Sequence, residues 1–516
     1  MSDASITTPV NSPVAREDDH QIPKAQLSWR SALAILISIQ IGSGIFSSPA
    51  SVDSNAPSPI VALSIWILSG LLSWAGAGAF AELGTCLKRA GGIQEYLRYI
   101  YGDAAASCMA WVWIFAVKPS AMAIQGIVIG ESIGYGLNDG RQGRFLSPWT
   151  MKGIALVVMN VIVLLNLRST NASVKLSSAF TAMKLFAAAS IAVGGIVVVL
   201  RHLAGHRDPD NSDWYTSSWV APRVTMNNGH RVDWRTLQWW RHLEHYSSAI
   251  YAGLWAYSGW DNVSFIARDI RNPATEIPKA INAAMTIVMF CQLFVNVSYY
   301  ILIPWKTIQS SNAVAVVAAR SNLGPVAALI MASLVSVSCA GTIQGTIFSV
   351  GRLTMAAADD GYLPAICGRI GIPWRTSELP SISTSHTNDE HSPLLQSHHP
   401  EHVESTPDGS AGNEREQHWN TPIVAMFIQG LMTSIFIIIG NFSELLTFVG
   451  MSVWAFLFLA VLGLVILRYR EPELERPYKV RYIAVPIVFV AASGVIVVGT
   501  DGVQGEVSRH LENMGR

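Results

Sequence analysis

The segment Gln40-Ile41-Gly42-Ser43-Gly44-Ile45-Phe46 lies in the middle of an apolar run over residues 31–50. Each glycine weakens a helix by about 1 kcal/mol relative to alanine, and Pro49 follows within two turns. These features predict a helix that unwinds here and leaves backbone N–H and C=O groups free. The alternative interpretation is a packing notch, in which the small residues let two helices approach closely.

Free backbone groups at such a break suit a small zwitterion. The N-terminus of the second half-helix attracts a carboxylate, and the carbonyl groups that end the first half attract an ammonium. We therefore interpret Ile41, Gly42, Ser43 and Gly44 as candidate binding residues.

A second interruption is found at residues 255–262, which read Trp-Ala-Tyr-Ser-Gly-Trp-Asp-Asn. It falls in the sixth predicted span, as the first break falls in the first, and this spacing is typical of a five-plus-five inverted repeat. Asp261 and Asn262 either line the inner half of a transport path or cap the second half of the broken helix. The candidate binding residues of this segment are Trp255, Ala256, Tyr257, Ser258, Gly259 and Asp261.

The composition indicates a protein that resides in the lipid bilayer. Hydrophobic residues make up 50% of the 516 residues and charged residues 14%, which would give a soluble protein too much apolar surface. Because a membrane helix needs roughly 20 apolar residues, the sequence predicts an all-α polytopic membrane protein with eleven spans. They are expected at 31–50, 60–83, 104–137, 150–167, 178–200, 246–267, 281–304, 324–357, 421–440, 444–467 and 483–500.

Several functional classes are excluded by the same composition. The 35 basic residues balance 35 acidic ones, so nothing points to a nucleic-acid partner. The five cysteines and the histidines lack metal-ligand spacing, so we expect neither a metal nor a cofactor. No span carries the His and acid clusters or the Ser/His pairing that hydrolysis requires, so the chain is not expected to be an enzyme.

Lysine and arginine follow the even-numbered spans, whereas the loops after spans one and nine have none. The positive-inside rule then places the N-terminus in the cytosol. We expect a disordered cytosolic tail over 1–29, a transmembrane core over 30–500 and a short tail over 501–516. Within the core, residues 201–245 form an extracellular loop and residues 368–419 a disordered cytosolic loop.

Five segments in this order resemble the L-type amino acid transporter family of the APC superfamily, and the chain is similar to fungal large neutral amino acid and methionine permeases. The resemblance implies a LeuT-like fold with discontinuous helices one and six. It covers most of residues 31–490. The segments are IGSGIF (41–46), AELGT (81–85), GLWAYSGWDN (253–262), GRLTMAAADDGYLP (351–364) and REPELERPYKV (470–480).

The resemblance also implies roles for single residues. Ser43 and Gly44 would contact the substrate carboxylate, and Trp255, where animal members often have Phe, would close over the substrate side chain. Gln344 and Trp454 match positions that face the pocket. Lys184 would place its ammonium where a sodium ion bridges spans one and eight in other relatives, unless it reaches toward the cytosolic interface.

One further lysine and one serine bear on the pocket. Lys118, beside Pro119 in span three, is expected in a structural ion pair rather than in substrate contact. Ser258 stands where many relatives have glycine, and it would add a hydroxyl and bulk next to the substrate.

The chain also departs from the family. The loop Asn138 to Trp149 has no cysteine, so we expect no disulfide-linked heavy chain. From the polar sequence after residue 500 we expect the usual twelfth span to be missing. The plasma membrane is the expected location, with an endosomal or vacuolar membrane as the alternative.

From these features we expect a Na⁺-independent permease or exchanger for large neutral amino acids, including methionine, that works by alternating access. Two alternatives stay open. One is an amino acid sensor that does not transport, and the other is a transporter of polyamines or other organic cations.

Overall fold

The computed structural model describes residues 28–87, 92–137, 146–168, 170–206, 211–227, 229–262, 264, 270–309, 311–368 and 423–496, with only the backbone described at 167–179 and 348. The predicted tails at 1–29 and 501–516 and the predicted loop at 368–419 lie outside the described residues, except for Ser28, Trp29 and Gly368. The position of a twelfth span also lies outside them.

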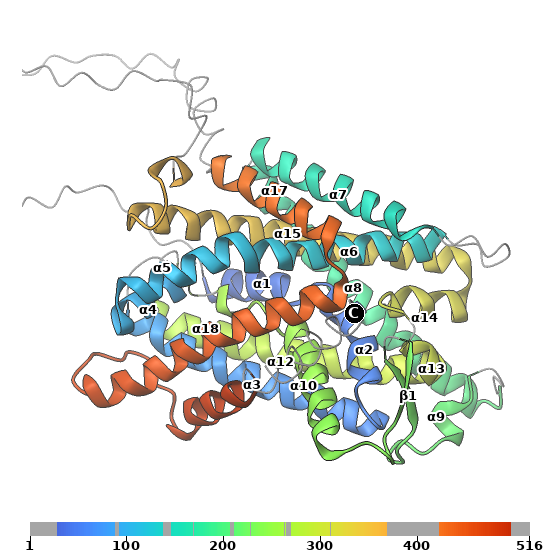
Figure 1. Ribbon diagram of the computed structural model, residues 1–516. Coiled ribbons are helices and arrows are strands. Elements are labelled where there is room, and N and C mark those ends of the chain that lie inside the picture. Colours follow the sequence, from blue (N-terminus) through green and yellow to red (C-terminus); the bar gives the residue numbers. More distant parts are fainter. Residues whose placement is uncertain are drawn as a thin grey trace, which may run out of the picture.

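Helices lie where the apolar runs predict them, and long helices run side by side across the molecule (Figure 1). They are α1 (Trp29–Gln40), α2 (Gly44–Ser54), α3 (Pro59–Cys86), α4 (Ile93–Tyr101), α5 (Asp103–Val112), the π-helical η1 (Trp113–Val117), α6 (Lys118–Leu137), α7 (Pro148–Arg168), α8 (Thr170–Leu203), α9 (Asp213–Thr216), α10 (Trp239–Ala256), the 3₁₀ turn η2 (Trp260–Asn262), α12 (Pro273–Leu302), α13 (Trp305–Ile308), α14 (Val314–Leu323), α15 (Pro325–Asp359), the 3₁₀ turn η4 (Ala365–Gly368), α17 (Ile423–Ile439), α18 (Phe442–Arg470) and a last helix, Ala484–Ile496.

The described residues contain seven helices long and apolar enough to cross a membrane, and the bent pair α1 and α2 makes an eighth. The three remaining predicted spans coincide with α10, α17 and Ala484–Ile496, which are shorter or more polar. Large apolar side chains on outward faces are exposed, as lipid contact requires; examples are Leu164, Phe186 and Phe294. The predicted all-α polytopic membrane fold of LeuT-like type is confirmed.

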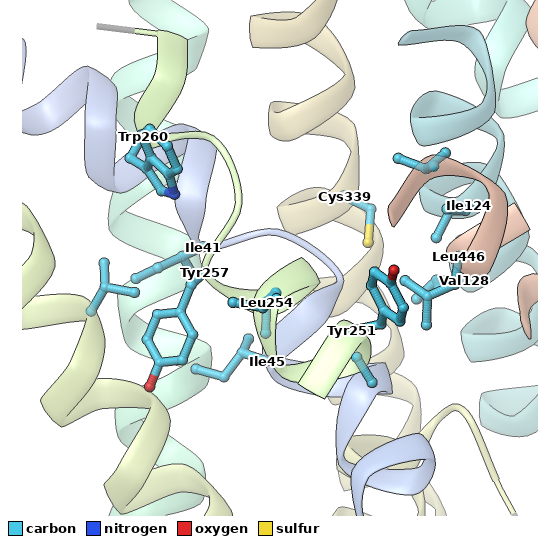
Figure 2. Packing of buried hydrophobic residues seen from close by; sticks show 14 of the residues in the cluster. Ile41, Ile45, Ile124, Val128, Tyr251, Leu254, Tyr257, Trp260, Cys339 and Leu446 are labelled. Atoms are coloured by element: carbon cyan, nitrogen blue, oxygen red, sulfur yellow. The ribbon is translucent and has the colours of Figure 1, made fainter. Parts of the chain in front are cut away.

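Both predicted breaks are present. The axes of α1 and α2 differ by 47°, and residues 41–43 between them are not helical. Helix α10 ends at Ala256, and Gly259 adopts a φ of +107°, a conformation that glycine tolerates best. A Cβ on Gly259 would also lie 2.7 Å from Cγ2 of Ile39, so the two breaks pack against each other. Figure 2 shows their backbones meeting between Ile41 and Leu254.

The segment 201–245, which was predicted to be an extracellular loop, contains secondary structure of its own. It contains α9 and an antiparallel hairpin of β1 (Val224–Asn227) and β2 (His230–Asp233), with Val224 opposite Asp233. The hairpin is attached to α2 through Thr225, which is fully buried. The Thr225 hydroxyl donates to the carbonyl of Ser54 and accepts from Trp234 Nε1 at 2.9 Å. Helix α10 accordingly begins at Trp239 rather than near residue 246.

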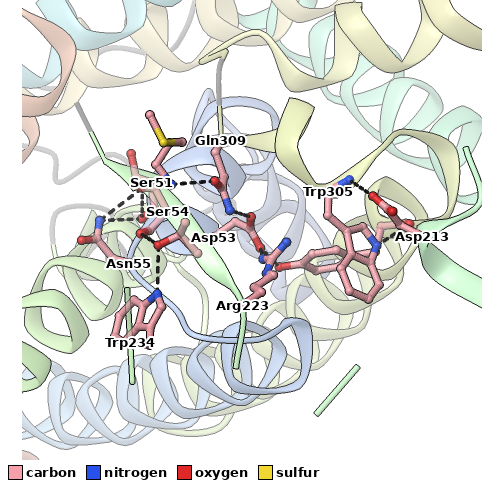
Figure 3. A network of polar contacts seen from close by, with 12 residues as sticks. Ser51, Asp53, Ser54, Asn55, Asp213, Arg223, Trp234, Trp305 and Gln309 are labelled. Atoms are coloured by element: carbon pink, nitrogen blue, oxygen red, sulfur yellow. Dashed lines mark hydrogen bonds and ion pairs between the residues drawn. The ribbon is translucent and has the colours of Figure 1, made fainter. Parts of the chain in front are cut away.

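Around the hairpin, a polar network ties α2 to the neighbouring segments (Figure 3). The buried carboxylate of Asp53 pairs with Arg223 and accepts from the hydroxyl of Tyr300 and from Nε2 of Gln309 at 2.8 Å. A charge buried in this way needs such partners, since an unpaired one is strongly unfavourable. We call this side of the molecule the hairpin end.

At the opposite end, which carries α4, two of the family-like segments meet. Glu82 of AELGT is fully buried and accepts from Arg468 Nε at 2.9 Å and from the Val480 N–H at 2.8 Å. Arg476 of REPELERPYKV donates to the carbonyl groups of Leu467 and Glu471 at 3.0 and 2.9 Å. These bonds satisfy the last turn of α18 and fix the chain that leads to the last helix.

A third family-like segment closes the same end. Asp360 of GRLTMAAADDGYLP accepts from Gln94 Nε2 at 2.8 Å and from Arg98 Nη1 at 2.7 Å, both on α4. The Asp360 carboxylate raises the pKa of Arg98 above its ordinary value, so the guanidinium stays charged. The hydroxyl of Tyr362 donates to Asp103 Oδ1 at 2.7 Å, which adds the start of α5 to the group.

We predict that Glu82→Ala markedly lowers the melting temperature of the purified protein, because it leaves the buried Arg468 unpaired. Breaking a buried pair costs about 3–5 kcal/mol. The measurement is thermal unfolding in detergent by intrinsic fluorescence. Glu444→Ala, at an exposed carboxylate of α18, is the matched control; an equal shift in both variants would contradict the prediction.

Candidate binding site

A cavity of about 90 Å³ lies where the two broken helices meet, with room for several water molecules or a small solute. Its wall is contributed by α1, α2, the region of η1 and α6, α10 and η2, α15 and α18. The lining residues are Ile39, Gln40, Gly42, Gly44, Trp113, Val117, Lys118, Ala121, Gln125, Tyr251, Leu254, Trp255, Ser258, Gly259, Asp261, Asn262, Thr342, Thr346, Leu446, Val449, Gly450, Val453 and Trp454.

The first break owes its shape to close contacts at its glycines. A Cβ built on Gly44 would lie 2.8 Å from the Cβ of Ala256 and nearer still to its Cα. A Cβ on Gly42 would lie 3.0 Å from Thr342 Oγ1 and 3.1 Å from Gln125 Nε2. Glycine is therefore required for the backbones of α2 and α10 to approach each other closely. The segment is both a packing notch and a break in the helix.

The backbone at this break offers hydrogen-bond donors to the cavity. Gly44 is the first residue of α2, so its N–H has no intrahelical acceptor. The Ser43 N–H donates to Gln125 Oε1 at 3.1 Å, and the Ser43 hydroxyl accepts from Trp255 Nε1 at 3.4 Å. The positive end of the α2 dipole therefore faces the cavity and favours an anionic group there.

At the second break, side chains of the protein use part of the freed carbonyl groups. The hydroxyl of Ser258 donates to the carbonyl of Trp255 at 2.7 Å, and Gln292 Nε2 donates to the carbonyl of Ala256 at 2.9 Å. The Ser258 hydroxyl is thus engaged locally and caps the end of α10, although its residue lines the cavity.

One side of the cavity is apolar and comes from α18. Leu446, Val449 and Val453 form this side, and Trp454 stands next to Phe489 of the last helix with ring centroids 5.5 Å apart. Figure 2 shows Tyr251 of α10 turned toward Leu446. Such a wall suits an apolar side chain, because its burial removes apolar surface from water.

Lys184 of α8 joins the first break to α15. It is fully buried, and its ammonium donates to the carbonyl of Ser38 on α1 and to Thr342 Oγ1 on α15 at 2.9 Å. A Cβ on Gly341 would lie 3.2 Å from Lys184 Cε, so this glycine makes room for the side chain. The ammonium therefore points into the helix bundle rather than to the membrane interface.

Lys118 and Asp261 form an ion pair in the wall of the cavity. Lys118 Nζ is 3.9 Å from Asp261 Oδ2 and lies over the Trp113 ring, 4.8 Å from its centroid. Their side chains are 11% and 12% exposed, so bulk water reaches them little. Asp261 and Asn262 both line the cavity, and Asn262 Nδ2 also donates to the carbonyl of Gly259 at 2.9 Å.

The structure brings most of the candidate residues to the cavity but not all. Gly42, Gly44, Trp255, Ser258, Gly259, Asp261 and Trp454 line it. Ser43 contributes the hydrogen bonds described above, and Ala256 packs its backbone against Gly44. The side chains of Ile41, Tyr257 and Gln344 are buried away from the cavity; Tyr257 packs on Trp66 of α3 with ring centroids 6.3 Å apart, on the far side of the break from Tyr251 (Figure 2).

The polar residues at the cavity that were not singled out as binding residues from the sequence include Gln40, Gln125 and Thr342. Gln125 and Thr342 hold the first break from α6 and α15. The side-chain amide of Gln40 is buried, and within the described part of the chain neither its oxygen nor its nitrogen has a hydrogen-bond partner. A polar side chain inside an apolar span was the available signal for all three. No group of metal-ligating side chains occurs among the described residues.

We predict that Gly44→Ala lowers the melting temperature of the purified protein by several degrees. The added Cβ overlaps Ala256, and overpacking of this kind costs about 1–3 kcal/mol. Gly153→Ala on α7 is the control, since a Cβ there meets no atom within 4 Å. Equal melting temperatures for the two variants would mean that the contact between α2 and α10 is not tight.

Comparison with known proteins agrees with this architecture. The sequence profile of the family described as "Amino acid permease" matches residues 27–500. The chain is 28% identical to the b(0,+)-type amino acid transporter 1 of Oryctolagus cuniculus over 474 residues, 90% of this chain and 82% of that protein. It is 28% identical to the cystine/glutamate transporter of Homo sapiens over 457 residues, 89% and 76% of the two chains.

A third relative is the large neutral amino acids transporter small subunit 2 of Oryctolagus cuniculus, 26% identical over 467 residues, 90% of this chain and 74% of that protein. All three relatives are transporters by name, and none is named as an enzyme. The profile match covers far more than half of the chain. The protein is an integral, multi-pass membrane protein that transports amino acids, and it belongs to the amino acid permease family of the APC superfamily, on its L-type transporter branch.

Proposed function

We propose that the protein carries large neutral amino acids, methionine included, by Na⁺-independent alternating access. The cavity between the N-terminus of α2 and the end of α10, closed on one side by the apolar wall of α18, is the observation that carries this proposal. The substrate carboxylate binds at Gly44, the ammonium binds at the carbonyl groups that end α1, and the side chain packs between Trp255 and α18. The name of the large neutral amino acids transporter supports this substrate class.

Sodium independence is supported by Lys184. Its ammonium lies between α1, α8 and α15 and bonds to oxygen atoms of Ser38 and Thr342. Carbonyl and hydroxyl oxygens are the ligands that a sodium ion would use, and a cation placed beside this fixed charge would be repelled. Lys184 then ties α1 to α15 without an ion.

Location and partners follow the sequence arguments. The N-terminus lies in the cytosol, the α4 end faces the cytosol and the hairpin end faces outward, in the plasma membrane or alternatively in an endosomal or vacuolar membrane. The relative named a small subunit is part of a larger assembly by its name. Because the segment 138–149 contains no cysteine, this chain works without a disulfide-linked heavy chain.

The contents of the cavity disfavour a polyamine transporter, and both alternatives remain outcomes of the test. A polyamine would need unpaired carboxylates, whereas Asp261 is already opposite Lys118. A sensor would bind its amino acid in this cavity without carrying it across the bilayer.

We predict that the purified protein in liposomes takes up labelled leucine and methionine equally well with and without sodium. The Ser43→Trp variant should lose this uptake, because a large ring fills the fully buried position at the first break. Faster uptake with leucine inside would indicate exchange, and dependence on a pH gradient would indicate symport. Leucine binding without flux would favour the sensor, and uptake of spermidine instead of leucine would favour the cation transporter.

We further predict that Lys184→Met lowers leucine uptake at least tenfold and that sodium does not restore it. The substitution keeps most of the side-chain volume but removes the bonds to Ser38 and Thr342. Lys279→Met, at an exposed lysine of α12, is the control. Normal uptake by Lys184→Met would contradict the prediction. Uptake by this variant that depends on sodium and reaches the wild-type rate would also contradict it, because the ammonium would then not be the only cation able to bridge α1 and α15.

A further inference from the structure

The cavity contains one acid and one base. Among its described lining residues, Lys118 and Asp261 are the only charged ones. They belong to different segments, since Lys118 begins α6 and Asp261 follows the break at the end of α10. Their charged atoms are 3.9 Å apart, which is an ion-pair distance, so each charge is the counter-charge of the other.

Because the pair is little exposed, its charges interact strongly with a substrate bound in the cavity. Both side chains are nearly buried, so water screens their charges weakly. A substrate side chain with a carboxylate is attracted by Lys118 but repelled by Asp261, and one with an ammonium meets the reverse. A neutral side chain disturbs neither charge and does not have to leave one of them unpaired.

We propose that the Lys118–Asp261 pair is a charge filter, in which each residue neutralises the charge of the other and so keeps the cavity selective for amino acids with neutral side chains. The inference deepens the proposed function, on which it rests, by assigning its charge selectivity to two residues. Discrimination of this kind works by penalising the wrong ligand rather than by improving contacts to the right one. The sign of the selectivity then depends on which member of the pair is removed.

The two single substitutions have opposite expected results. Asp261→Asn leaves the ammonium of Lys118 over the Trp113 ring without a counter-charge. We therefore expect the uptake of acidic amino acids to rise relative to that of leucine. Lys118→Met leaves the carboxylate of Asp261 without a counter-charge. We therefore expect the uptake of basic amino acids to rise relative to that of leucine. The double variant has a neutral cavity and should again prefer neutral substrates.

The test measures uptake of labelled leucine, glutamate and lysine by each variant in liposomes. We expect the glutamate-to-leucine ratio to rise at least tenfold in Asp261→Asn and the lysine-to-leucine ratio to rise at least tenfold in Lys118→Met. The double variant should return to the wild-type ratios. Glu244→Gln is the matched control, because it neutralises one member of the exposed Arg241–Glu244 pair of α10, whose charged atoms are 3.3 Å apart.

Ratios within twofold of wild type in both single variants, or a rise of both ratios in the same variant, would overturn the proposal. Melting curves are recorded for every variant. If one single variant does not fold, the other decides; if neither folds, the pair serves folding alone and the proposal is overturned.

Failure of the proposed function gives a different result. Wild-type protein that carries no leucine would contradict the neutral substrate class. The charge filter would then be tested by measuring how much each amino acid raises the melting temperature of the protein in detergent. We expect glutamate to raise the melting temperature of Asp261→Asn but not that of wild type, and equal responses would overturn the filter.

Discussion

The contact between Gly44 and Ala256 is the constraint on which the rest of the structure depends. Unwound backbone is tolerated within a membrane only where protein or a polar cavity surrounds it. Two broken helices can shield each other's free N–H and C=O groups only if their backbones approach closely, and the missing Cβ of Gly44 permits this approach. The positive φ of Gly259 then places the second chain against Ile39 of α1, beside the cavity between the two breaks.

Buried charges organise the remainder of the bundle. Three of them lie at junctions between segments that are distant in sequence: Lys184 joins α1 and α15, Asp53 joins α2 to the hairpin end, and Glu82 joins α3 to α18. A buried charge without its partner is far more unfavourable than the pair is favourable. These contacts therefore specify which helices are neighbours, and van der Waals packing between the helices adds to their association.

The family-like segments acquire a physical meaning from these junctions. AELGT and REPELERPYKV are separated by hundreds of residues, yet Glu82 of the first binds Arg468 and the backbone of Val480 near and within the second. GRLTMAAADDGYLP supplies Asp360 to α4 in the same region. The resemblance was thus carried by residues that close the α4 end as well as by residues that shape the cavity.

The sequence by itself determined the membrane environment, the positions of the spans and the two breaks, because apolar runs and glycine clusters are local features of the chain. It also pointed to Gly42, Gly44, Trp255 and Asp261, which do line the cavity. Only the tertiary structure decided that Tyr257 turns toward α3, that Gln40 and Gln125 reach the cavity, and that Lys118 opposes Asp261. Periodicity does not say which way a side chain points once a helix unwinds, and it does not pair residues on different helices. Those outcomes depend on how the helices pack, and packing is a property of the whole bundle.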